Sequence, residues 1–404
     1  MSVHDDAAAI GGDLAELRRR IHQDPEIGLD LPRTQAKVLA ALDGLPLEVT
    51  RGRALSSVTG VLRGGRPGPT VLLRGDMDAL PITERTGLPY ASAVTGVMHA
   101  CGHDLHTAML VGAARLLSAR QAELPGNVIF MFQPGEEGQA GATHMISEGL
   151  LGAAGGRPVA AYALHVASAQ LPRGVFSTRP GSMMAAADIL DVTVRGHGGH
   201  ASQPHLAQDP IPVACEMVTA LQTLVTRRFD VFDPVVITVG SFHAGTADNI
   251  VPDEAHFLAT VRSFSAVARD RVRSASLRLI ADLATGHGLQ AEADYIDGYP
   301  VTVNDPAETA FAGQAVADLF GKGRLIAQAN PLPGAEDFSF VLDEVPGAFL
   351  MLGAVPEGSD PASAPSNHAA DAVFDDAVLP DGAAVLAELA LRRLAAGAAV
   401  PAKP

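Results

Sequence analysis

The chain has 404 residues, of which 47% are hydrophobic and 18% are charged, and its formal net charge is -16. This length predicts two or three domains with ample hydrophobic core. The acidic balance would repel nucleic acid and anionic lipid, so we expect neither as a partner. No apolar run reaches the roughly 18 residues of a membrane span, and residues 1–6 lack the basic and apolar segments of a signal peptide. With only Cys101 and Cys215, we expect no disulfide framework and a cytoplasmic protein.

The first part of the chain alternates helical segments with strongly apolar strands. Apolar spacing predicts helices at 13–22, 33–42 and 105–119. Apolar runs bounded by turn residues predict strands at 57–62, 70–74, 127–132 and 159–164. This alternation predicts an α/β domain with a mostly parallel sheet that is covered on both faces.

Acidic and histidine side chains directly follow three of these predicted strands. They are Asp76 with Asp78, Glu136 with Glu137, and His165. In open α/β sheets, sites form at the carboxyl ends of strands, so the sequence indicates a site at this edge. One carboxylate of the Glu136–Glu137 pair could ligate a metal while its neighbour serves as general base on an activated water. A solvated acidic turn is the alternative explanation of this pair.

A short stretch rich in metal-binding side chains lies between two of these strands. Residues 98–106 read Met-His-Ala-Cys-Gly-His-Asp-Leu-His and place Cys101 and His103 two positions apart. Cysteine and neutral histidine are preferred ligands of zinc and similar metals, so the stretch predicts a metal site. The residue pattern alone leaves His99 and His106 as further candidates, and a loop around a buried cysteine as the alternative.

From about residue 185 the pattern changes to an alternating β-α-β-β-α-β order. The expected elements are strands at 188–194, 235–240, 255–262 and 291–295, with helices at 210–226 and 267–285. This order is the ferredoxin-like pattern, in which two helices cover one face of an antiparallel sheet. It predicts a small domain at 185–296 inserted between the two parts of a larger one, 1–184 and 297–404. Helices near 306–319 and 379–396 and a strand at 349–352 restore the α/β character.

The inserted segment and the last part of the chain contain further candidates. In Gly-His-Gly-Gly-His at 196–200, either histidine could donate to a developing oxyanion. Arg262, at the end of a predicted strand, could bind a substrate carboxylate with two hydrogen bonds. Asn249 and His368 carry little weight as single residues. We expect the Glu336–Asp337 pair to cap a helix.

Six motifs in one order resemble a known family. They are Arg-Gly-Asp-Met-Asp-Ala-Leu-Pro at 74–81, Met-His-Ala-Cys-Gly-His-Asp at 98–104, Phe-Gln-Pro-Gly-Glu-Glu-Gly at 132–138, Ala-Leu-His at 163–165, Gly-His-Gly-Gly-His-Ala at 196–201 and Gly-Ala-Glu-Asp-Phe at 334–338. The chain resembles the amidohydrolase branch of the two-metal aminoacylase and carboxypeptidase family. That branch includes N-acyl-L-amino-acid amidohydrolases, hippurate hydrolases and plant auxin-amino-acid conjugate hydrolases.

The resemblance implies a two-metal catalytic domain. Its ligands would be Cys101, His103, Glu137, His165 and His368. Glu136 would be the general base, and Asp78 would orient a ligand. Carboxypeptidase relatives have a histidine ligand where this chain has Asp76, and in the amidohydrolase branch the cysteine takes that role. Within 98–106, His99 and His106 would then have supporting or structural roles, and Asp104 has no assigned role.

The same resemblance implies that the inserted domain is a lid and dimerisation domain. His200 and Asn249 would reach the active site of the partner subunit in a homodimer or higher homo-oligomer, where His200 would stabilise the oxyanion. Arg262 would bind the free carboxylate of a small N-acyl amino acid, acetylated, benzoylated or related. The two divalent ions would be zinc, manganese, nickel or cobalt.

Two departures from the family pattern stand out. Gly135 replaces a usual alanine, and Ala369-Ala370-Asp371 replaces a common Pro-Arg segment, which weakens inference of the substrate. A dipeptidase or carboxypeptidase on the same scaffold is the nearest alternative. A metal-free hydrolase using Cys101 with a nearby histidine, and a non-catalytic binding protein, are the others.

Overall fold

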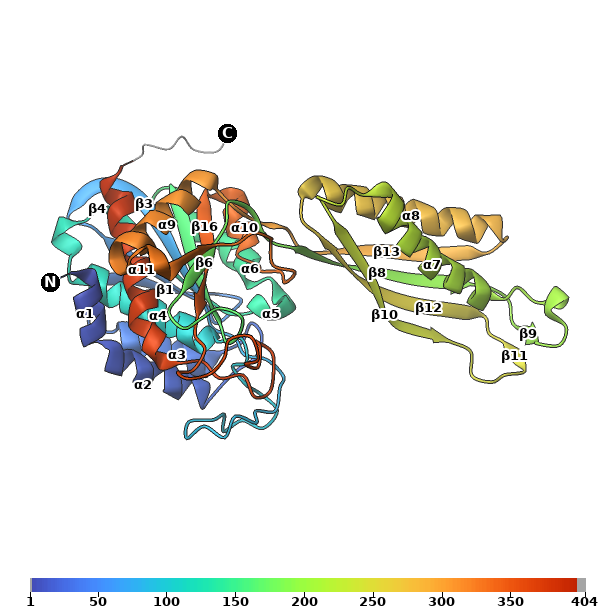
Figure 1. The fold of residues 1–404 in the computed structure, drawn as a ribbon, viewed down its shortest axis with the longest axis horizontal. Coiled ribbons are helices and arrows are strands. Elements are labelled where there is room, and N and C mark those ends of the chain that lie inside the picture. Colours follow the sequence, from blue (N-terminus) through green and yellow to red (C-terminus); the bar gives the residue numbers. More distant parts are fainter. Residues whose placement is uncertain (1, 398–404) are drawn as a thin grey trace. The chain divides into compact units, whose positions relative to one another are not determined.

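The computed structural model describes residues 2–397, which form two compact units (Figure 1). Of the described residues, the first unit combines 2–183, 303–330 and 337–397. The second combines Met184–Thr302 and Pro331–Glu336.

An eight-stranded sheet forms the centre of the first unit. Its strands lie in the order β1-β2-β4-β3-β5-β16-β6-β15. Their bounds are Leu47–Arg51 for β1, Val58–Arg63 for β2, Arg66–Asp76 for β3, Pro125–Gln133 for β4, Ala160–Ala167 for β5, Phe176–Thr178 for β6, Leu325–Ala327 for β15 and Gly347–Gly353 for β16. The central run β4-β3-β5-β16 is parallel, whereas β1, β2 and β4 pair antiparallel. The predicted mostly parallel sheet is therefore confirmed.

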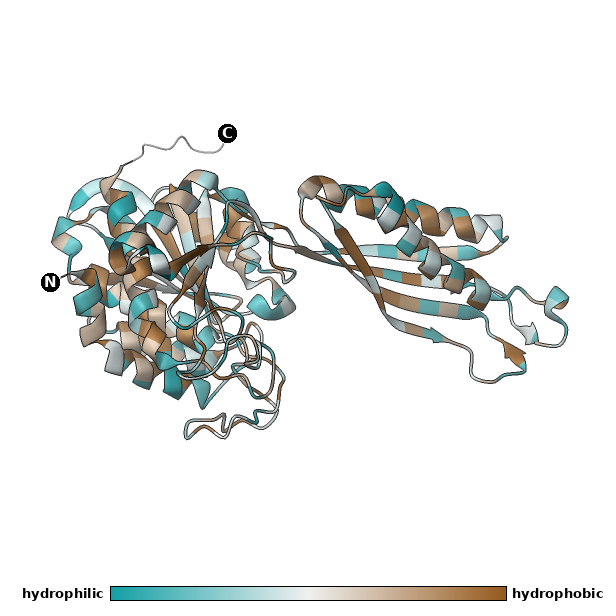
Figure 2. Ribbon diagram, in the orientation of Figure 1, coloured by the Kyte–Doolittle hydropathy of each residue, from teal (hydrophilic) through white to brown (hydrophobic). Residues whose placement is uncertain are grey.

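Helices pack on both faces of this sheet (Figure 1). On one face, α4 (His103–Ser118) and α11 (Leu379–Ala395) pack directly on the sheet. The helices that pack against these two are α1 (Val3–Ala9), α2 (Gly11–His22), α3 (Pro32–Leu42) and α9 (Pro306–Phe320). The short helices near the other face are α5 (Glu136–Gln139), α6 (Gly141–Ser147) and α10 (Ser339–Glu344). The central strands are strongly hydrophobic, whereas the helices carry both polar and apolar residues (Figure 2). This difference follows from burial, because the central strands are covered on both faces, whereas the outer helices, such as α2 and α3, keep one face in solvent.

The second unit is a four-stranded antiparallel sheet with two helices. Its strands lie in the order β10-β12-β8-β13. The elements are β8 (Ala186–Arg195), α7 (Pro210–Arg228), β10 (Val235–Ala244), β12 (Glu254–Ser263), α8 (Ala266–Gly286) and β13 (Gln290–Tyr299). Alternate residues of β12 are buried beneath the helices, which is the pattern of a sheet covered on one face. The predicted ferredoxin-like order is confirmed.

Two short strand pairs lie outside the two main sheets. β9 (Gly199–His200) pairs with β11 (Ile250–Val251), and β7 (Gly181–Met184) pairs with β14 (Thr302–Asn304). Among the described helices, none combines the length and apolar character that a bilayer crossing requires.

Candidate metal centre

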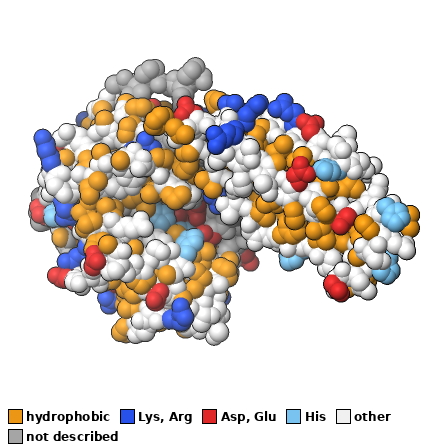
Figure 3. Space-filling model, turned by 45° about the vertical axis from the view of Figure 1, so that its right-hand side comes forward, with side chains coloured by type: hydrophobic (Ala, Val, Ile, Leu, Met, Phe, Trp, Pro, Cys, Tyr) orange, Lys and Arg blue, Asp and Glu red, His pale blue; other side chains and the backbone are white. Residues whose placement is uncertain are grey.

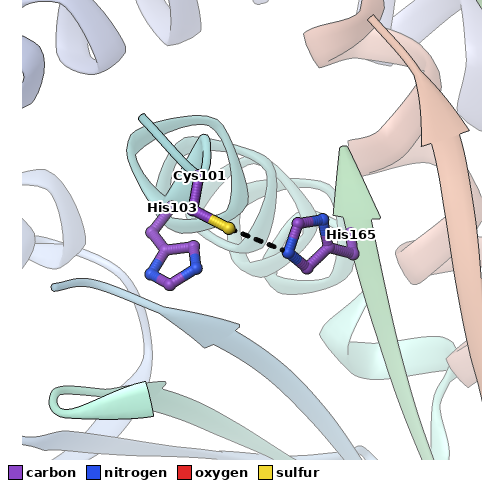
Figure 4. Close-up of side chains that lie close together, drawn as sticks. All are labelled: Cys101, His103 and His165. Carbon is purple, nitrogen blue, oxygen red and sulfur yellow. Dashed lines mark hydrogen bonds between the residues drawn. The ribbon is translucent and has the colours of Figure 1, made fainter. Parts of the chain in front are cut away.

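The five predicted metal ligands gather at the carboxyl ends of the parallel strands of the first unit. Cys101 and His103 lie at the start of α4, and His165 lies on β5 (Figure 4). Glu137 follows β4, and His368 follows β16. Residues far apart in the sequence thus meet because parallel strands direct their carboxyl ends to one edge of the sheet.

The potential ligand atoms form two overlapping groups. The Cys101 sulfur lies 3.3 Å from His165 Nε2 and 3.3 Å from His368 Nε2. His368 Nε2 lies 3.2 Å from Glu137 Oε1, which lies 4.0 Å from His103 Nε2. Within 4.8 Å of one another are the donor atoms of Cys101, His103 and His165, and likewise those of Cys101, Glu137 and His368. Cys101 belongs to both groups, so its sulfur lies among the other four side chains.

Backbone geometry places the two predicted ligands at the start of α4. Gly102 has a φ of 85°, and a Cβ at this position would lie 2.3 Å from Val166 Cγ2. Only glycine adopts this conformation readily and leaves room for Val166. The turn therefore brings the side chains of Cys101 and His103 into one small volume.

Hydrogen bonds orient the side chains of two further predicted ligands, His165 and His368. His165 Nδ1 donates to the carbonyl of Val166 at 2.8 Å, which leaves the Nε2 lone pair directed at Cys101. The Asn367 amide donates to the carbonyls of Cys101 at 3.2 Å and Val166 at 3.0 Å. The adjacent N–H of His368 donates to the carbonyl of Ala100 at 2.8 Å. Asn367 thus fastens the His368 loop to the other ligands, a role that the sequence did not reveal.

Asp78 contacts two predicted ligands at once. Its Oδ1 lies 3.3 Å from His103 Nδ1, and its Oδ2 accepts the N–H of Glu137 at 2.9 Å. A carboxylate that binds the second ring nitrogen of a metal-ligating histidine fixes the tautomer and the orientation of the ring.

The residues present fit a pair of divalent metal ions. His103 Nε2 is buried and has no hydrogen-bond partner among the described residues. Such a buried nitrogen is costly unless another group satisfies it. One thiolate, three imidazoles and a carboxylate form a donor set suited to zinc, cobalt or nickel, and the carboxylate also suits manganese.

The electrostatics of the cluster agree with this fit. Hydrogen bonds with the Cys101 sulfur and the Glu137 carboxylate raise the pKa of His368 to about 10. Burial opposes the charged form of His103, but Asp76 and Cys101 raise the pKa of His103 well above its usual value. The negative charge of the cluster therefore favours cations, in the form of protons or of metal ions.

Asp76 and His106 form a supporting layer behind the ligands. His106 Nδ1 donates to Asp76 Oδ1 at 2.5 Å, and His106 Nε2 accepts the N–H of Val166 at 2.8 Å. Both ring nitrogens of His106 are therefore committed to hydrogen bonds. The Arg74 guanidinium donates to Asp76 Oδ2 at 2.5 Å, and all three side chains are buried. A structural role for His106 stays a prediction, and its two hydrogen bonds are consistent with it.

The expectation that the Glu336–Asp337 pair caps a helix is wrong for Asp337. Helix α10 begins at Ser339, and no side chain caps it. The buried Asp337 carboxylate instead accepts from Arg74 Nη2 at 2.9 Å and from Gln133 Nε2 at 2.8 Å. The Asp337 N–H in turn donates to Glu136 Oε1 at 3.4 Å. The signal for this network was a pair of long polar side chains, Arg74 and Gln133, on apolar strands.

The three candidates of the inserted segment do not lie together within the second unit. His200, on β9, pairs with Ile250, and the Ala201 N–H donates to the Asn249 carbonyl at 3.1 Å. Both therefore belong to the loop end of the sheet. Arg262 lies at the other end of β12, roughly 26 Å away at the usual rise per residue, where its Nη1 donates to Thr260 Oγ1 at 2.6 Å. The visible face carries histidine side chains on both units (Figure 3).

Comparison with known proteins identifies the family. The profile of Peptidase family M20/M25/M40 matches residues 72–392. The chain belongs to this family. Within the M20/M25/M40 family, the resemblance to the amidohydrolase branch that the motifs indicated is confirmed.

Relatives cover nearly the whole chain. Thermostable carboxypeptidase 2 of Saccharolobus solfataricus is 36% identical over 96% of this chain and 97% of its own length. N-acetylcysteine deacetylase of Bacillus subtilis is 36% identical over 84% of this chain and 88% of its own. The crystal structure of the Bacillus subtilis YXEP protein, described as a dinuclear metal binding peptidase from the M20 family, has a TM-score of 0.82 and 32% identity, and the match covers 96% of this chain and 99% of that one.

Proposed function

We propose that the protein is a metal-dependent amidohydrolase that cleaves the amide bond of N-acyl amino acids to a carboxylic acid and a free amino acid. The observation that carries this proposal is the convergence of five ligand side chains with one additional carboxylate, Glu136. The donor atoms of His103, Glu136 and Glu137 lie within 4.8 Å of one another. A carboxylate beside a metal site is the arrangement that general-base hydrolysis requires.

Cys101, His103, Glu137, His165 and His368 would hold two divalent ions, whose identity among zinc, manganese, nickel and cobalt the donor set leaves open. When bound, these ions would supply Lewis acidity toward the amide carbonyl and toward water. The five clustered donor side chains, and the likeness to the YXEP protein, described as a dinuclear metal binding peptidase, support two ions over one.

Glu136 would move the proton of the reaction. Its carboxylate takes a proton from the attacking water and then delivers it to the nitrogen of the leaving amino acid. The side chain is buried, and the Asp337 N–H holds one of its oxygens. Asp78 keeps His103 and the backbone of Glu137 in position during this exchange.

Residues of the second unit would bind the substrate. Arg262 would pair with the free carboxylate, because a guanidinium matches a carboxylate with two parallel hydrogen bonds. His200 would donate to the developing oxyanion, and Asn249 would line the same pocket. The protein's net charge of -16 makes such a local cation important for an anionic substrate.

The distance between these residues supports a homodimer or higher homo-oligomer. An N-acyl amino acid cannot span the roughly 26 Å of strand between Arg262 and the loops of His200 and Asn249. One active site would therefore take Arg262 from one chain and His200 and Asn249 from another. In this proposal the segment 185–296 is a lid and dimerisation domain, 1–184 and 297–404 form the catalytic domain, and the enzyme works in the cytoplasm.

Carboxypeptidase or dipeptidase activity is the second candidate, favoured by the likeness to the Saccharolobus solfataricus enzyme. The two activities differ in the group on the acyl side of the scissile bond. A panel of acetyl-, benzoyl- and longer acyl-amino acids, run beside dipeptides and C-terminal peptide substrates, separates them. We expect turnover to be highest for the acyl-amino acids; a clear preference for peptides would favour the second candidate.

Chelation tests metal dependence. Treatment with phenanthroline should abolish hydrolysis of the preferred substrate, and added metal ions should restore it. Cys101→Ser should lower metal content, whereas Cys215→Ser, which alters an exposed thiol on α7, should leave metal content and turnover unchanged. If the chelated protein retains full activity and Cys101→Ser alone inactivates it, Cys101 acts as a nucleophile and the metal proposal is wrong.

A further inference from the structure

A second buried polar cluster lies beside the ligand-bearing turn. We call it the α2 clamp, and its members are Arg18, His22, Glu84 and Asp104. Their side chains are between 0% and 4% exposed. None of the four belongs to the ligand set, and the family motifs left Asp104 without a role.

Asp104 is the centre of this cluster. Its Oδ2 accepts from Arg18 Nε at 2.7 Å and from His22 Nδ1 at 2.8 Å. Arg18 and His22 are four residues apart on α2, so they present adjacent side chains on one helix face. Arg18 Nη1 also donates to Asp376 at 3.1 Å. Asp104 directly follows His103, so these bonds attach the first turn of α4 to α2.

The other end of the clamp holds the loop between Pro81 and Val97. His22 Nε2 lies 3.3 Å from Glu84 Oε1, and Glu84 Oε2 accepts the N–H of Ser92 at 2.7 Å. The next residue, Arg85, donates its N–H to the carbonyl of Ala370 at 2.7 Å, two positions after His368. These hydrogen bonds therefore connect α2 both to the turn that carries Cys101 and His103 and to the loop that carries His368.

The segment from Cys101 to His103 is held on its two flanks. Asp104 follows it, and His99, two residues before Cys101, packs its ring 6.2 Å from the ring of His22. A buried ion pair contributes little net stability compared with apolar residues of the same volume. Because the Arg18–Asp104 pair lies beside the predicted ligands Cys101 and His103, its location favours a role in positioning these ligands over a role in stabilising the fold.

We propose that Asp104 is a positioning residue, held by Arg18 and His22, that fixes Cys101 and His103 in the arrangement needed for tight metal binding. This inference rests on the proposed function, because it takes Cys101 and His103 as ligands. Asp104 acts through the backbone of the turn and touches neither the ions nor the substrate.

Cobalt binding tests the proposal. The variants are Asp104→Ala, which removes the acceptor, and Asp104→Asn, whose carbonyl can still accept from Arg18 and His22. The matched control is Arg393→Met, which breaks another buried pair of the first unit, Arg393 Nε to Glu308 Oε1 at 3.0 Å. Each protein is loaded with Co²⁺, and three quantities are measured: the visible spectrum, the rate of Co²⁺ release to a chelator and the melting temperature.

We expect Asp104→Ala to release Co²⁺ about tenfold faster or more and to show an altered thiolate–cobalt absorption band, with Asp104→Asn closer to the wild type. Arg393→Met should lower the melting temperature and leave both cobalt properties unchanged. Arg18→Met, which breaks the same bond from the other side, should behave like Asp104→Ala and replaces it if that variant does not fold.

Two results would overturn the inference. One is wild-type release and spectrum in both Asp104→Ala and Arg18→Met. The other is an equal change in Arg393→Met, which would reduce the clamp to a contribution to stability. If the wild-type protein itself binds no Co²⁺, the proposed function fails together with this inference, whereas wild-type binding with unchanged variants rejects the positioning role alone.

Discussion

Substitution of Gly102 by alanine should damage the metal centre through the backbone. Gly102 separates Cys101 from His103 and has a φ of 85°. An alanine Cβ there would lie 2.3 Å from Val166 Cγ2 and 3.1 Å from Phe374 Cε1. The turn can accommodate the new methyl group only by moving the two ligands or the side chains around them.

The magnitude follows from two separate costs. A non-glycine residue in the left-handed region costs about 1–2 kcal/mol. Forcing a methyl group into a packed core costs about 1–3 kcal/mol more. We therefore expect Gly102→Ala to lower the free energy of unfolding by about 2–5 kcal/mol. Gly155→Ala separates the two costs, because Gly155 has a φ of 87° and no heavy atom within 4 Å of an added Cβ.

Urea unfolding followed by circular dichroism measures both variants, and metal analysis after dialysis measures retention of the ions. Gly155→Ala should lose about 1–2 kcal/mol and keep its metal content. Gly102→Ala should lose more stability and also part of its metal. Equal stability losses in the two variants, with full metal content in Gly102→Ala, would refute the close packing of this turn against Val166.

Three further predictions concern the substrate, the partner subunit and pH. Arg262→Ala should raise KM for N-acyl amino acids far more than it lowers kcat, while Arg195→Ala, an exposed arginine of the same sheet, should change neither; steady-state kinetics decide. Co-expression of the inactive variants His200→Ala and Glu136→Gln should recover about a quarter of wild-type turnover if His200 acts across the dimer, and none if it acts in its own subunit. Burial opposes ionisation of Glu84, but hydrogen bonds with His22, Thr86 and Ser92 lower its pKa from 4.5 to about 2. Its contribution to stability is therefore present above pH 4.5 and lost as pH falls toward 2, so Glu84→Gln should flatten the acid decline of the unfolding free energy; an unchanged decline would contradict this assignment.

Much of the fold could be predicted because the hydrophobic pattern of each segment matches the burial of that segment in the structure. The strands around Val71 and Ile129 are apolar on both faces, which only a covered parallel sheet explains. From residue 188, buried residues alternate with more exposed ones along the strand. This change of pattern indicated the antiparallel sheet, which is covered on one face. The polar residues that follow the strands then indicated which edge of the sheet would carry the site.

The network behind the ligands could not be predicted from the sequence. Asp337 lies two positions before the first residue of helix α10, and local rules assign such a residue to capping. Its real partners, Arg74 and Gln133, are more than 200 positions away, and only the folded sheet brings them together. The role of Asp104 could not be predicted for the same reason, because its partner Arg18 lies on a helix 86 positions earlier in the chain.

Metal stoichiometry and turnover, measured together on Glu136→Gln, separate metal binding from proton transfer. Glu136 is predicted to move the proton of the reaction while the five ligand residues hold the ions. The variant should therefore bind two divalent ions per subunit, as the wild type should, and lose hydrolysis of N-acyl amino acids by a factor of about 100 or more. Wild-type turnover in this variant would show that Glu136 is not the general base, and a parallel loss of both ions and activity would show that Glu136 acts in metal binding.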